Sequence, residues 1–418
     1  MLFVKIANCQ LKELFVLLMV TFSFITFFNQ ESYAQSQSVI IANPTTFTRN
    51  KEIISIKKID LVNIDNSLYP SVKRQNQFLV SQTIDTNSDG IWDELLIEVS
   101  LAANVKDTLQ INWLLKEEIS FPKRTNIHLS LRSDTEVPSS EINHTTRKRG
   151  FVQNIAKPFY QMEGPGFEND KVAFRAFFDH RNGKDIYGKM VDVPILEKVG
   201  VGASWHNLQP WGMDILKVGN SLGAGALAVK ENNKIYRLGD ADTTTFQVLY
   251  EGALQAAFKL NFTNWDVVNA KQNGSEIISI TKGNFYYQNE VSMVLNKFQN
   301  LVTGFSNFID AKVLYKKYNT HFSSISTYGK QADGSDNNLG MALLFSTKNY
   351  LENKMADQTT TIPNTSYLVL KPCNKTSIYF FACWEKSDNR FATRQGFENY
   401  VDQTVQELSN PIKIKIVK

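Results

Sequence analysis

The sequence predicts an all-β protein, an antiparallel sandwich or barrel with few helices. Short runs rich in β-branched and aromatic residues recur along the chain, and turn residues such as Asp89-Gly90 and Asn273-Gly274 separate them. Residues 259–263 alternate polar and apolar side chains, which is typical of a half-solvated antiparallel strand. No fixed-period repeat, dinucleotide-binding motif or P-loop interrupts this series.

One helix is predicted, close to the C-terminus, over residues 394–408. Its apolar side chains recur at helical spacing, and Asn410-Pro411 ends it. Residues 412–417 then alternate and predict a final strand.

Length and composition allow a large core. The chain has 418 residues, of which 43% are hydrophobic and 21% charged, enough for two ordinary domains or one large all-β domain. We expect residues 35–418 to form a single large β-sandwich unit. A smaller N-terminal sandwich reaching to about residue 130 is the alternative division.

Residues 1–34 are predicted to be a secretory signal peptide. Lys5 and Lys12 precede the apolar run Leu14 to Phe28, and Ser32-Tyr33-Ala34 supplies small residues for cleavage. Cys9 lies before the apolar run, which argues against a lipid anchor. We therefore expect a mature protein that is exported to the periplasm or the medium and has no membrane segment.

The formal net charge is +4, and it stays +4 without the signal peptide. The densest basic run, Arg147-Lys148-Arg149, is too short for a nucleic-acid patch, so we expect an acidic small ligand and no nucleic acid. An exported chain allows Cys373 and Cys383 to pair, but two buried thiols fit the sequence as well. Oligomeric state is not indicated.

A loop of oxygen-bearing side chains lies between two predicted strands. Counted from Asp85, positions 1, 3, 5 and 9 are Asp85, Asn87, Asp89 and Asp93, and Gly90 is at position 6. This spacing suits a structural Ca²⁺ ion, although Leu96 stands where an EF-hand has its bidentate glutamate. An Asx-rich turn without metal fits the same residues.

Residues 161–227 concentrate the polar chemistry of the chain. Read as a strand, residues 171–179 place Phe174 and its alternate neighbours on a core face and Arg175 with Asp179 on the other face. That second face suits either the wall of a sugar-binding cleft or a solvated sheet surface with cross-strand ion pairs.

The flanking residues favour a site. Carboxylates, guanidinium groups, histidines and tryptophans gather before and after the strand and again in residues 205–217. We assign substrate binding to Glu163, Asn169, Asp170, His180, Arg181, Trp205 and Trp211. Carboxylates that could serve in hydrolysis are Glu163, Glu168, Asp170, Asp179, Asp185 and Asp214. Neither a zinc-site spacing nor a serine nucleophile motif is present.

Two segments carry a family resemblance: EGPGFENDKVAFRAFFDHRNGKDIYGK at 163–189 and WHNLQPWGMDILKVGNSLGAG at 205–225. They resemble the signature segments of an exported bacterial family of polysaccharide-utilisation loci, long described as a domain of unknown function. Residues 85–94 and 397–416 resemble its terminal segments. His180 and Phe167 stand where the family is expected to have tryptophan, so the resemblance gives His180 no catalytic role.

The resemblance implies a galactose-mutarotase-like β-supersandwich and the activity of the family's ulvan oligosaccharide dehydratases. Such an enzyme removes water across C4–C5 of a uronic acid at the non-reducing end of an acidic oligosaccharide and leaves a 4,5-unsaturated uronate. No cofactor beyond a structural Ca²⁺ is expected.

That reaction needs a cation for the carboxylate, a base and an acid. Arg175 or Arg181 suits the first task, and His206 is the expected base, because imidazole exchanges protons near neutral pH. The assigned catalytic residues are His206, Arg175, Tyr187, Lys217 and Asp214, with Asp214 orienting His206 or Lys217. Tyr160 is a further acid or base.

Two other classes fit the same residues. A polysaccharide lyase, an epimerase or a hydrolase could use the scaffold, and so could a carbohydrate-binding protein without activity. Product mass separates most of these, since dehydration removes one water and leaves the sugar chain at full length.

Overall fold

The computed structural model describes residues 36–61, 65, 68–114, 119–133, 139–154, 156–201, 204–267 and 270–417. Within these residues nearly all regular structure is strand, and the paired strands of every sheet run antiparallel. The predicted all-β sandwich is therefore confirmed. The predicted signal peptide lies outside the described residues. None of the helices described is long and apolar enough to cross a lipid bilayer.

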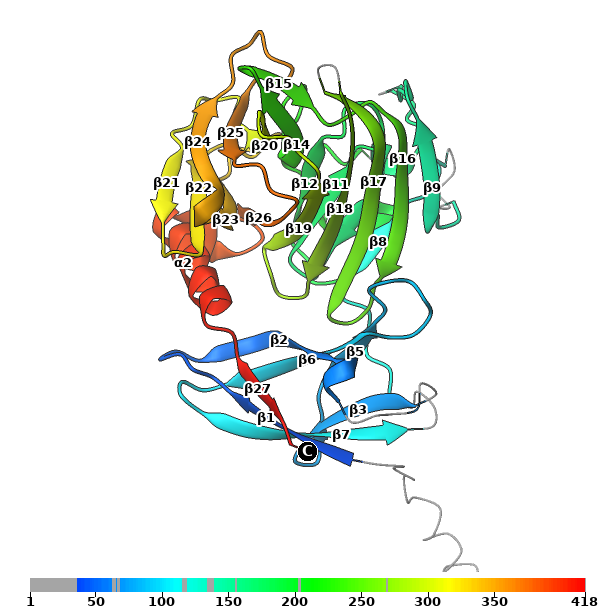
Figure 1. Cartoon of the computed structure of the whole chain (residues 1–418), viewed down its shortest axis with the longest axis vertical. Coiled ribbons are helices and arrows are strands. Elements are labelled where there is room, and N and C mark those ends of the chain that lie inside the picture. Colours follow the sequence, from blue (N-terminus) through cyan, green and yellow to red (C-terminus); the bar gives the residue numbers. More distant parts are fainter. Residues whose placement is uncertain are drawn as a thin grey trace, which may run out of the picture.

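Two sheets form a smaller lobe, drawn at the bottom of Figure 1 in blue and cyan with β27 in red. The first has the order β27 (Lys413–Ile416), β1 (Ser36–Ala42), β7 (Lys106–Leu114), β3 (Tyr69–Arg74), β4 (Gln77–Phe78). The second has the order β2 (Arg49–Lys57), β6 (Glu94–Leu101), β5 (Ser81–Ile84). Apolar side chains of both sheets, among them Val39, Ile97 and Trp113, make one buried core.

Three further sheets form a larger lobe. The nine-stranded sheet has the order β21 (Leu314–Lys317), β22 (Phe322–Gly329), β23 (Leu339–Ser346), β26 (Lys375–Trp384), β19 (Tyr286–Met293), β18 (Ala270–Thr281), β17 (Gln255–Val267), β16 (Ala241–Tyr250), β9 (His144–Lys148). One five-stranded sheet has the order β13 (Gly212–Asp214), β12 (Lys184–Lys189), β11 (Val172–Ala176), β10 (Gly166–Glu168), β8 (Asn126–His128). The other has the order β15 (Lys234–Arg237), β14 (Ala224–Glu231), β20 (Gln299–Ser306), β25 (Thr365–Leu370), β24 (Tyr350–Met355).

The main core lies where the five-stranded sheets pack on the nine-stranded one. Phe174 of β11 lies edge-on to Tyr287 of β19 with ring centroids 5.0 Å apart, and Phe167 of β10 packs beside both. Burial of such aromatic rings supplies much of the hydrophobic stabilisation of a sandwich. This packing fixes the inner face of the β11 sheet, so its outer face is left to carry polar groups.

The predicted helix is α2 (Arg394–Ser409), and its N-cap is Thr393, whose Oγ1 accepts a hydrogen bond from the Gly396 amide. Phe397, Val401 and Val405 bury the apolar stripe against the nine-stranded sheet. The chain then crosses to the smaller lobe, where β27 pairs with β1. The remaining helices are single 3₁₀ turns: η1 (Lys58–Asp60), η2 (Gln161–Glu163), η3 (Leu196–Lys198), η4 (Thr347–Asn349) and η5 (Asn389–Ala392).

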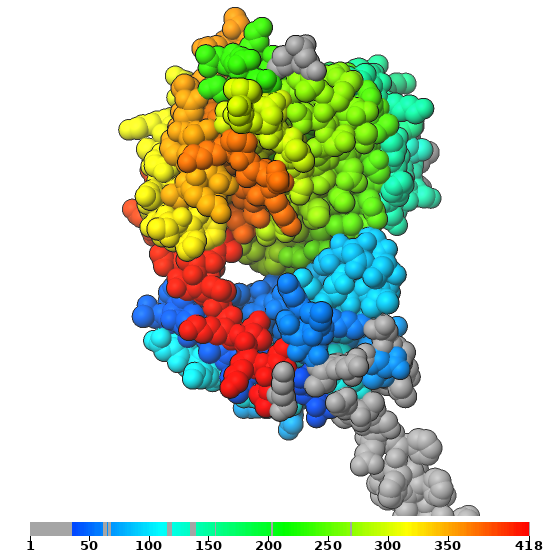
Figure 2. Space-filling model, in the orientation of Figure 1, coloured from blue at the N-terminus to red at the C-terminus, as the bar shows by residue number. Residues whose placement is uncertain are grey.

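The lobes meet through polar contacts around a groove. Lys282 of the larger lobe lies 2.5 Å from Glu98 of the smaller one, and the Gln82 amide oxygen accepts hydrogen bonds from two backbone amides of the larger lobe. A groove of about 560 Å³ remains between them, beside the end of α2, where Figure 2 shows a gap.

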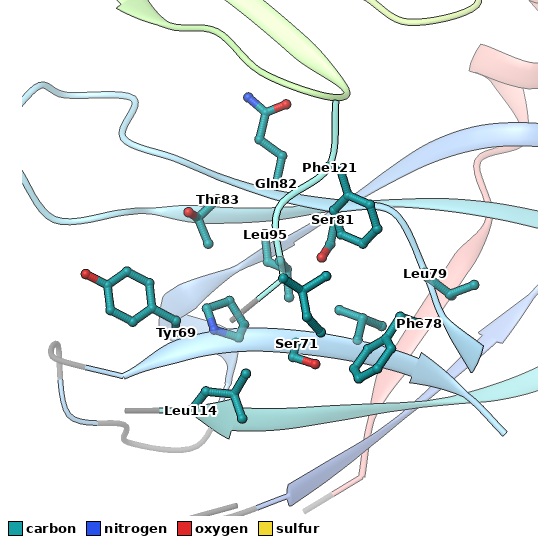
Figure 3. A pocket seen from close by; sticks show the side chains of 13 residues that line it. Tyr69, Ser71, Phe78, Leu79, Ser81, Gln82, Thr83, Leu95, Leu114 and Phe121 are labelled. Carbon is teal, nitrogen blue, oxygen red and sulfur yellow. The ribbon is translucent and has the colours of Figure 1, made fainter. Parts of the chain in front are cut away.

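A second pocket, in the smaller lobe, is shown in Figure 3. Tyr69, Phe78 and Phe121 line it together with side chains of both sheets, and it holds only about 40 Å³. Ligand sites usually occupy roughly 300 Å³ or more, so this pocket is a packing gap.

Cys373 and Cys383 are free thiols and do not form a disulfide; of the two buried thiols that the alternative predicted, Cys383 is buried and Cys373 is half-buried. Burial raises the pKa of each thiol, which keeps both protonated at neutral pH.

Candidate functional site

The polar residues of the central block lie on the outer face of the β11 sheet. Arg175 of β11 is in register with Asp185 of β12, and Tyr187 of β12 is in register with Asp214 of β13. Residues in antiparallel register share a face, so three strands deliver these four side chains to one place. The predicted alternation is confirmed here, since Phe174 lies in the core and Arg175 on the opposite face.

Arg175 lies within a ring of carboxylates. Its Nε and Nη2 donate to Asp185 Oδ2 over 3.0 and 2.5 Å, Nη2 also lies 3.3 Å from Asp214 Oδ2, and Nη1 lies 3.4 Å from Glu163 Oε1. Only 4% of the Arg175 side chain is exposed. Every nitrogen of this guanidinium already has a partner, so it orders the acids around it and offers no free donor to a substrate.

Glu163 joins two arginines. Its Oε1 faces Arg175 and its Oε2 accepts a short hydrogen bond from Arg181 Nη2. Glu163 and Met162 have φ of 65° and 56°, and Gly164, whose φ is 157°, has no room for a Cβ because Ala176 O would lie 2.1 Å away. Non-glycine residues at positive φ store strain, which is found often at functional sites. The turn therefore holds the Glu163 carboxylate in place at a conformational cost.

Arg181 is the more accessible of the two arginines, with 19% of its side chain exposed. Its Nε and Nη2 bind the buried Asp179 carboxylate, with Nη2 2.6 Å from Asp179 Oδ2. Among the described residues nothing bonds to Arg181 Nη1, and that nitrogen is not buried. Arg181 can thus present one free donor to an anion at the surface.

His206 lies at the surface end of this series of ion pairs. Its Nδ1 lies 3.5 Å from Asp214 Oδ2, and 65% of its side chain is exposed whereas Asp214 is buried. Burial and the neighbouring Asp185 raise the pKa of Asp214 well above its usual value, against the lowering effect of Arg175. The pKa of Asp185 is also raised, by burial, against Arg175. We call the connected residues Asp179, Arg181, Glu163, Arg175, Asp185, Asp214 and His206 the charge network.

Aromatic rings frame the network. The Phe177 ring lies between the two guanidinium groups, 4.8 Å from Arg175 and 4.2 Å from Arg181, and the Trp205 ring lies 5.5 Å from Arg175. Trp211 packs edge-on against Tyr187 with centroids 6.0 Å apart. The Tyr187 hydroxyl is buried and has no hydrogen-bond partner in the described structure, and burial raises its pKa well above the usual value. Tyr187 is therefore a proton donor rather than an anion.

The structure brings most of the predicted residues together. Eight of them lie in or against the charge network: His206, Arg175, Tyr187, Asp214, Glu163, Arg181, Trp205 and Trp211. They come from two segments that β12 and β13 place side by side.

Two predicted substrate-binding residues are bound elsewhere. Asn169 is fully buried, donates to the Thr281 and Asn284 carbonyls, and accepts from two backbone amides, so its side chain has no free group. Asp170 accepts from the Gly283 amide and lines the groove between the lobes, at the end of β11 remote from Arg175. Backbone groups of the β18–β19 turn bind both side chains away from Arg175, and their assignment to substrate binding stays a prediction.

Two more lie at the periphery. The Lys217 ammonium lies over the Phe308 ring at 4.8 Å, and no acidic group contacts it in the described structure. His180 is exposed. Its hydrogen bond to Phe151 O is donated by its backbone amide and not by its ring. Neither touches the charge network, so their predicted roles stay predictions.

The second face of β11 is covered by protein, and this corrects both interpretations of it. Ala173 and Tyr187 pack under Ile195, Leu196 and Val199, and all are buried. Residues 195–199 have no pattern that marks them as a cover, because short apolar segments in loops resemble strands in sequence. The charge network therefore lies in a protein interior that reaches the surface at His206 and Arg181.

Some residues in and beside the charge network were not singled out from the sequence. Asp179 and Asp185 were predicted only as two of several carboxylates. The sequence has no pattern that marks Gln153, which contacts the charge network. The Gln153 amide donates to Glu163 O at 2.6 Å and lies 3.4 Å from Asp179 Oδ2. Glu168, in contrast, pairs with Lys189 at 2.6 Å and with the amides of residues 195 and 196 and is structural.

The Asp85 loop is held by its own side chains. Asp85 accepts from the amides of Ser88 and Gly90, and Asp93 accepts from the amide and hydroxyl of Thr86. In the described part of the chain no three His, Cys, Asp or Glu side chains gather closely enough to hold a metal ion. Ca²⁺ binding by Asp85, Asn87, Asp89 and Asp93 stays a prediction that would need further oxygen ligands.

Two solved structures share this architecture, both from Enterococcus faecalis. A protein in the glycosyl hydrolase family 38 matches with a TM-score of 0.52 and 8% identity over 94% of this chain and 48% of its own. An alpha-mannosidase from strain V583 matches with a TM-score of 0.49 and 9% identity over 92% of this chain and 46% of its own. The chain thus spans about half the length of these structures, and the likeness concerns the fold.

Comparison with curated proteins gives no match. A family model described as "Domain of unknown function (DUF4861)" matches residues 41–414, nearly all of the described chain. The chain therefore belongs to the DUF4861 family.

Proposed function

We propose that the protein is an exported carbohydrate dehydratase. It would remove water across C4–C5 of a uronic acid at the non-reducing end of an acidic, ulvan-type oligosaccharide and form a 4,5-unsaturated uronate. The family resemblance of residues 163–189 and 205–225 supports this activity, and the likeness in fold to a protein in the glycosyl hydrolase family 38 agrees with a carbohydrate substrate.

The observation that carries the proposal is the pair of His206 and Asp214. An exposed imidazole can reach a substrate, and the buried carboxyl group of Asp214, 3.5 Å from Nδ1, sets the ring orientation from behind. This is the arrangement that proton abstraction next to a carboxylate requires.

One imidazole can serve as both the base and the acid of this elimination. His206 takes the C5 proton, and the electron pair forms the C4–C5 double bond as the C4–O bond breaks. The imidazolium returns the proton to the departing hydroxyl, which leaves as water. The substrate carboxylate spreads the charge that develops at C5, and the free Nη1 donor of Arg181 stabilises it. The Trp205 ring, whose centroid lies 5.5 Å from that of the His206 ring, forms one wall of the site for the reacting sugar.

Arg175 has a positioning role in this proposal. Three carboxylates occupy its guanidinium, so it does not bind the substrate carboxylate as the sequence suggested. It keeps Asp185, Asp214 and Glu163 together in the interior and so holds the Asp214 carboxyl group in place beside His206.

The test is to incubate the mature protein with glucuronate- or iduronate-ended oligosaccharides and to record product mass and enoate ultraviolet absorbance. We expect a product one water lighter, of unchanged chain length, that absorbs in the ultraviolet. A shortened chain would assign a lyase or hydrolase instead, and binding without a new product would assign a binding protein. The His206→Ala variant serves as the inactive control.

A further inference from the structure

A loop of the nine-stranded sheet reaches the surface end of the charge network. It is formed by residues 330–338, between β22 and β23, and we call it the β22–β23 loop. The Asp333 amide donates to the Ile215 carbonyl at 2.8 Å. A Cβ built on Gly334 would lie 3.3 Å from the carbonyl oxygen of His206. The β22–β23 loop therefore adds a third chain segment to the site, beside the segment that carries His206.

The loop presents Asp333 to solvent from a fixed position. The preceding residue, Ala332, is buried in the main core, whereas Asp333 is exposed. On the other side, the amides of Asn337 and Asn338 donate to the two carboxylate oxygens of Glu385 at 2.6 Å each. Because the chain is anchored before and after Asp333, this side chain has a defined place at the site.

The carboxylate of Asp333 is free to bind a ligand. Among the described residues no cation and no hydrogen-bond donor binds it. It lies close enough to Asp214 for its charge to contribute to the raised pKa of that buried acid. A carboxylate only accepts hydrogen bonds, so the groups that Asp333 can bind are donors.

An acidic sugar offers this site two kinds of group. Its carboxylate is repelled by Asp333 and attracted by Arg181, which lies at the other end of the charge network from His206. Its ring hydroxyl groups are donors, and the two oxygens of a carboxylate suit two neighbouring hydroxyls. In a uronic acid the carboxylate is attached to C5, on one side of C4, and the C3 and C2 hydroxyls follow on the other side. A sugar whose C4–C5 bond lies at His206 can therefore direct these hydroxyls to Asp333.

We propose that Asp333 binds the C2 and C3 hydroxyl groups of the terminal uronate and makes the site select a unit in which both are free. A sulfate ester on either oxygen removes a donor and brings a negative charge next to Asp333, so a terminal unit sulfated there is excluded. This inference rests on the proposed function for its acidic oligosaccharide substrate. Two residues of opposite charge, Arg181 and Asp333, then set the orientation of the sugar.

The test measures binding without turnover, by calorimetry on the full mature chain carrying His206→Ala. The probes are a glucuronate-ended tetrasaccharide with free C2 and C3 hydroxyls on its terminal unit, its form methylated at these two oxygens, and its form sulfated there. Asp333→Ala and Asp333→Asn are made in the same background. Asp336→Ala is the matched control, since Asp336 belongs to the same loop, is 92% exposed and lies 3.8 Å from its cation, Lys330.

The parent should bind the free probe about tenfold more tightly than the methylated one, as expected for the loss of a charge-assisted hydrogen bond, and should bind the sulfated one most weakly. Asp333→Ala should bind all three with similar, weak affinity. Asp333→Asn keeps an acceptor without the charge, so it should bind the sulfated probe more tightly than the parent does. Asp336→Ala should behave as the parent. In turnover by the protein that retains His206, Asp333→Ala should raise KM about tenfold and leave kcat nearly unchanged.

The same preference among the three probes in Asp333→Ala and in the parent would overturn the proposal, and so would a parent that binds none of them. The variants should fold, because the Asp333 side chain is exposed and has no partner in the described structure, and their unfolding temperatures check this. Failure of the dehydratase proposal is distinguishable. It appears as absence of product from the protein that retains His206, while the preference among the probes still depends on Asp333.

Discussion

His206 and Asp214 form a pair that spans the protein surface. Nδ1 of the exposed histidine lies 3.5 Å from Oδ2 of a carboxyl group that is almost wholly enclosed. The backbone amide of Asp214 donates to the Trp205 carbonyl at 2.8 Å, so the main chain itself holds the two segments together. The pair thus places a buried carboxyl group directly behind a base at the surface.

Replacing His206 by alanine should reduce turnover about 10²–10⁴-fold, the usual contribution of a positioned base. The unfolding temperature should change little, because the side chain is mostly exposed and contacts only Asp214 and the Trp205 ring among the described residues. His321→Ala, an exposed histidine of the larger lobe, is the matched control and should retain full rate. Equal rates in the two variants would exclude His206 as the base.

Asp214→Asn should alter the pH dependence of stability. Because the folded-state pKa of Asp214 is raised, the native protein binds more protons than the unfolded chain above the usual carboxyl pKa, and its stability falls as pH rises from there. Asparagine has no such dependence. The unfolding temperature of the variant minus that of the parent should therefore increase between pH 4 and pH 8.

Differential scanning calorimetry at four or five pH values measures that difference. A difference that is constant or decreases with pH would show that Asp214 titrates normally in the folded protein. Activity should fall in Asp214→Asn at every pH, because the asparagine amide does not hold the His206 ring as the carboxyl group does.

Arg175→Met should destabilise the protein by about 3–5 kcal/mol, since it leaves Asp185, Asp214 and Glu163 enclosed without their cation. Arg181→Met should cost a similar amount, about 3–5 kcal/mol, because its partner Asp179 is fully buried and would lose its cation. Urea unfolding measures both. Adding Asp185→Asn to Arg175→Met should restore part of the loss, and strict additivity of the two changes would contradict the ion pair.

Gly212→Ala should disrupt the site by displacing β13. A Cβ at this position would lie 1.8 Å from Gly188 O, and φ is 131°. Gly283→Ala is the control, since its φ is 85° but no atom lies within 4 Å of the new Cβ. We expect the control to lose about 1 kcal/mol and Gly212→Ala to lose several times more, with loss of activity. Similar unfolding temperatures for the two variants would show that β13 can move away.

The sequence predicted elements whose pattern is local. The stripe of residues 394–408 gave the helix observed at Arg394–Ser409, and the alternation around Phe174 and Arg175 gave their opposite faces. Both depend on side-chain period, which the backbone geometry sets directly.

The sequence could not predict which partner binds each polar side chain. Asn169 and Glu163 have similar neighbours in the chain, yet Asn169 bonds to carbonyls of residues 281 and 284 while Glu163 bridges two arginines. Such partners are distant in sequence, and a polar residue type carries no record of whether water, backbone or ligand will satisfy it. The covering segment 195–199 was missed for the same reason.

The pairing of β27 with β1 has a consequence for how the chain folds. β1 is the first described strand to leave the ribosome and β27 is the last, yet Val39 and Ile416 are neighbours in one ladder. Until β27 arrives, β1 presents one bare edge, which is a template for pairing with other chains. The smaller lobe can therefore be completed only after residues 413–416 have left the ribosome, and a chain without these residues would be prone to aggregate rather than merely be less active.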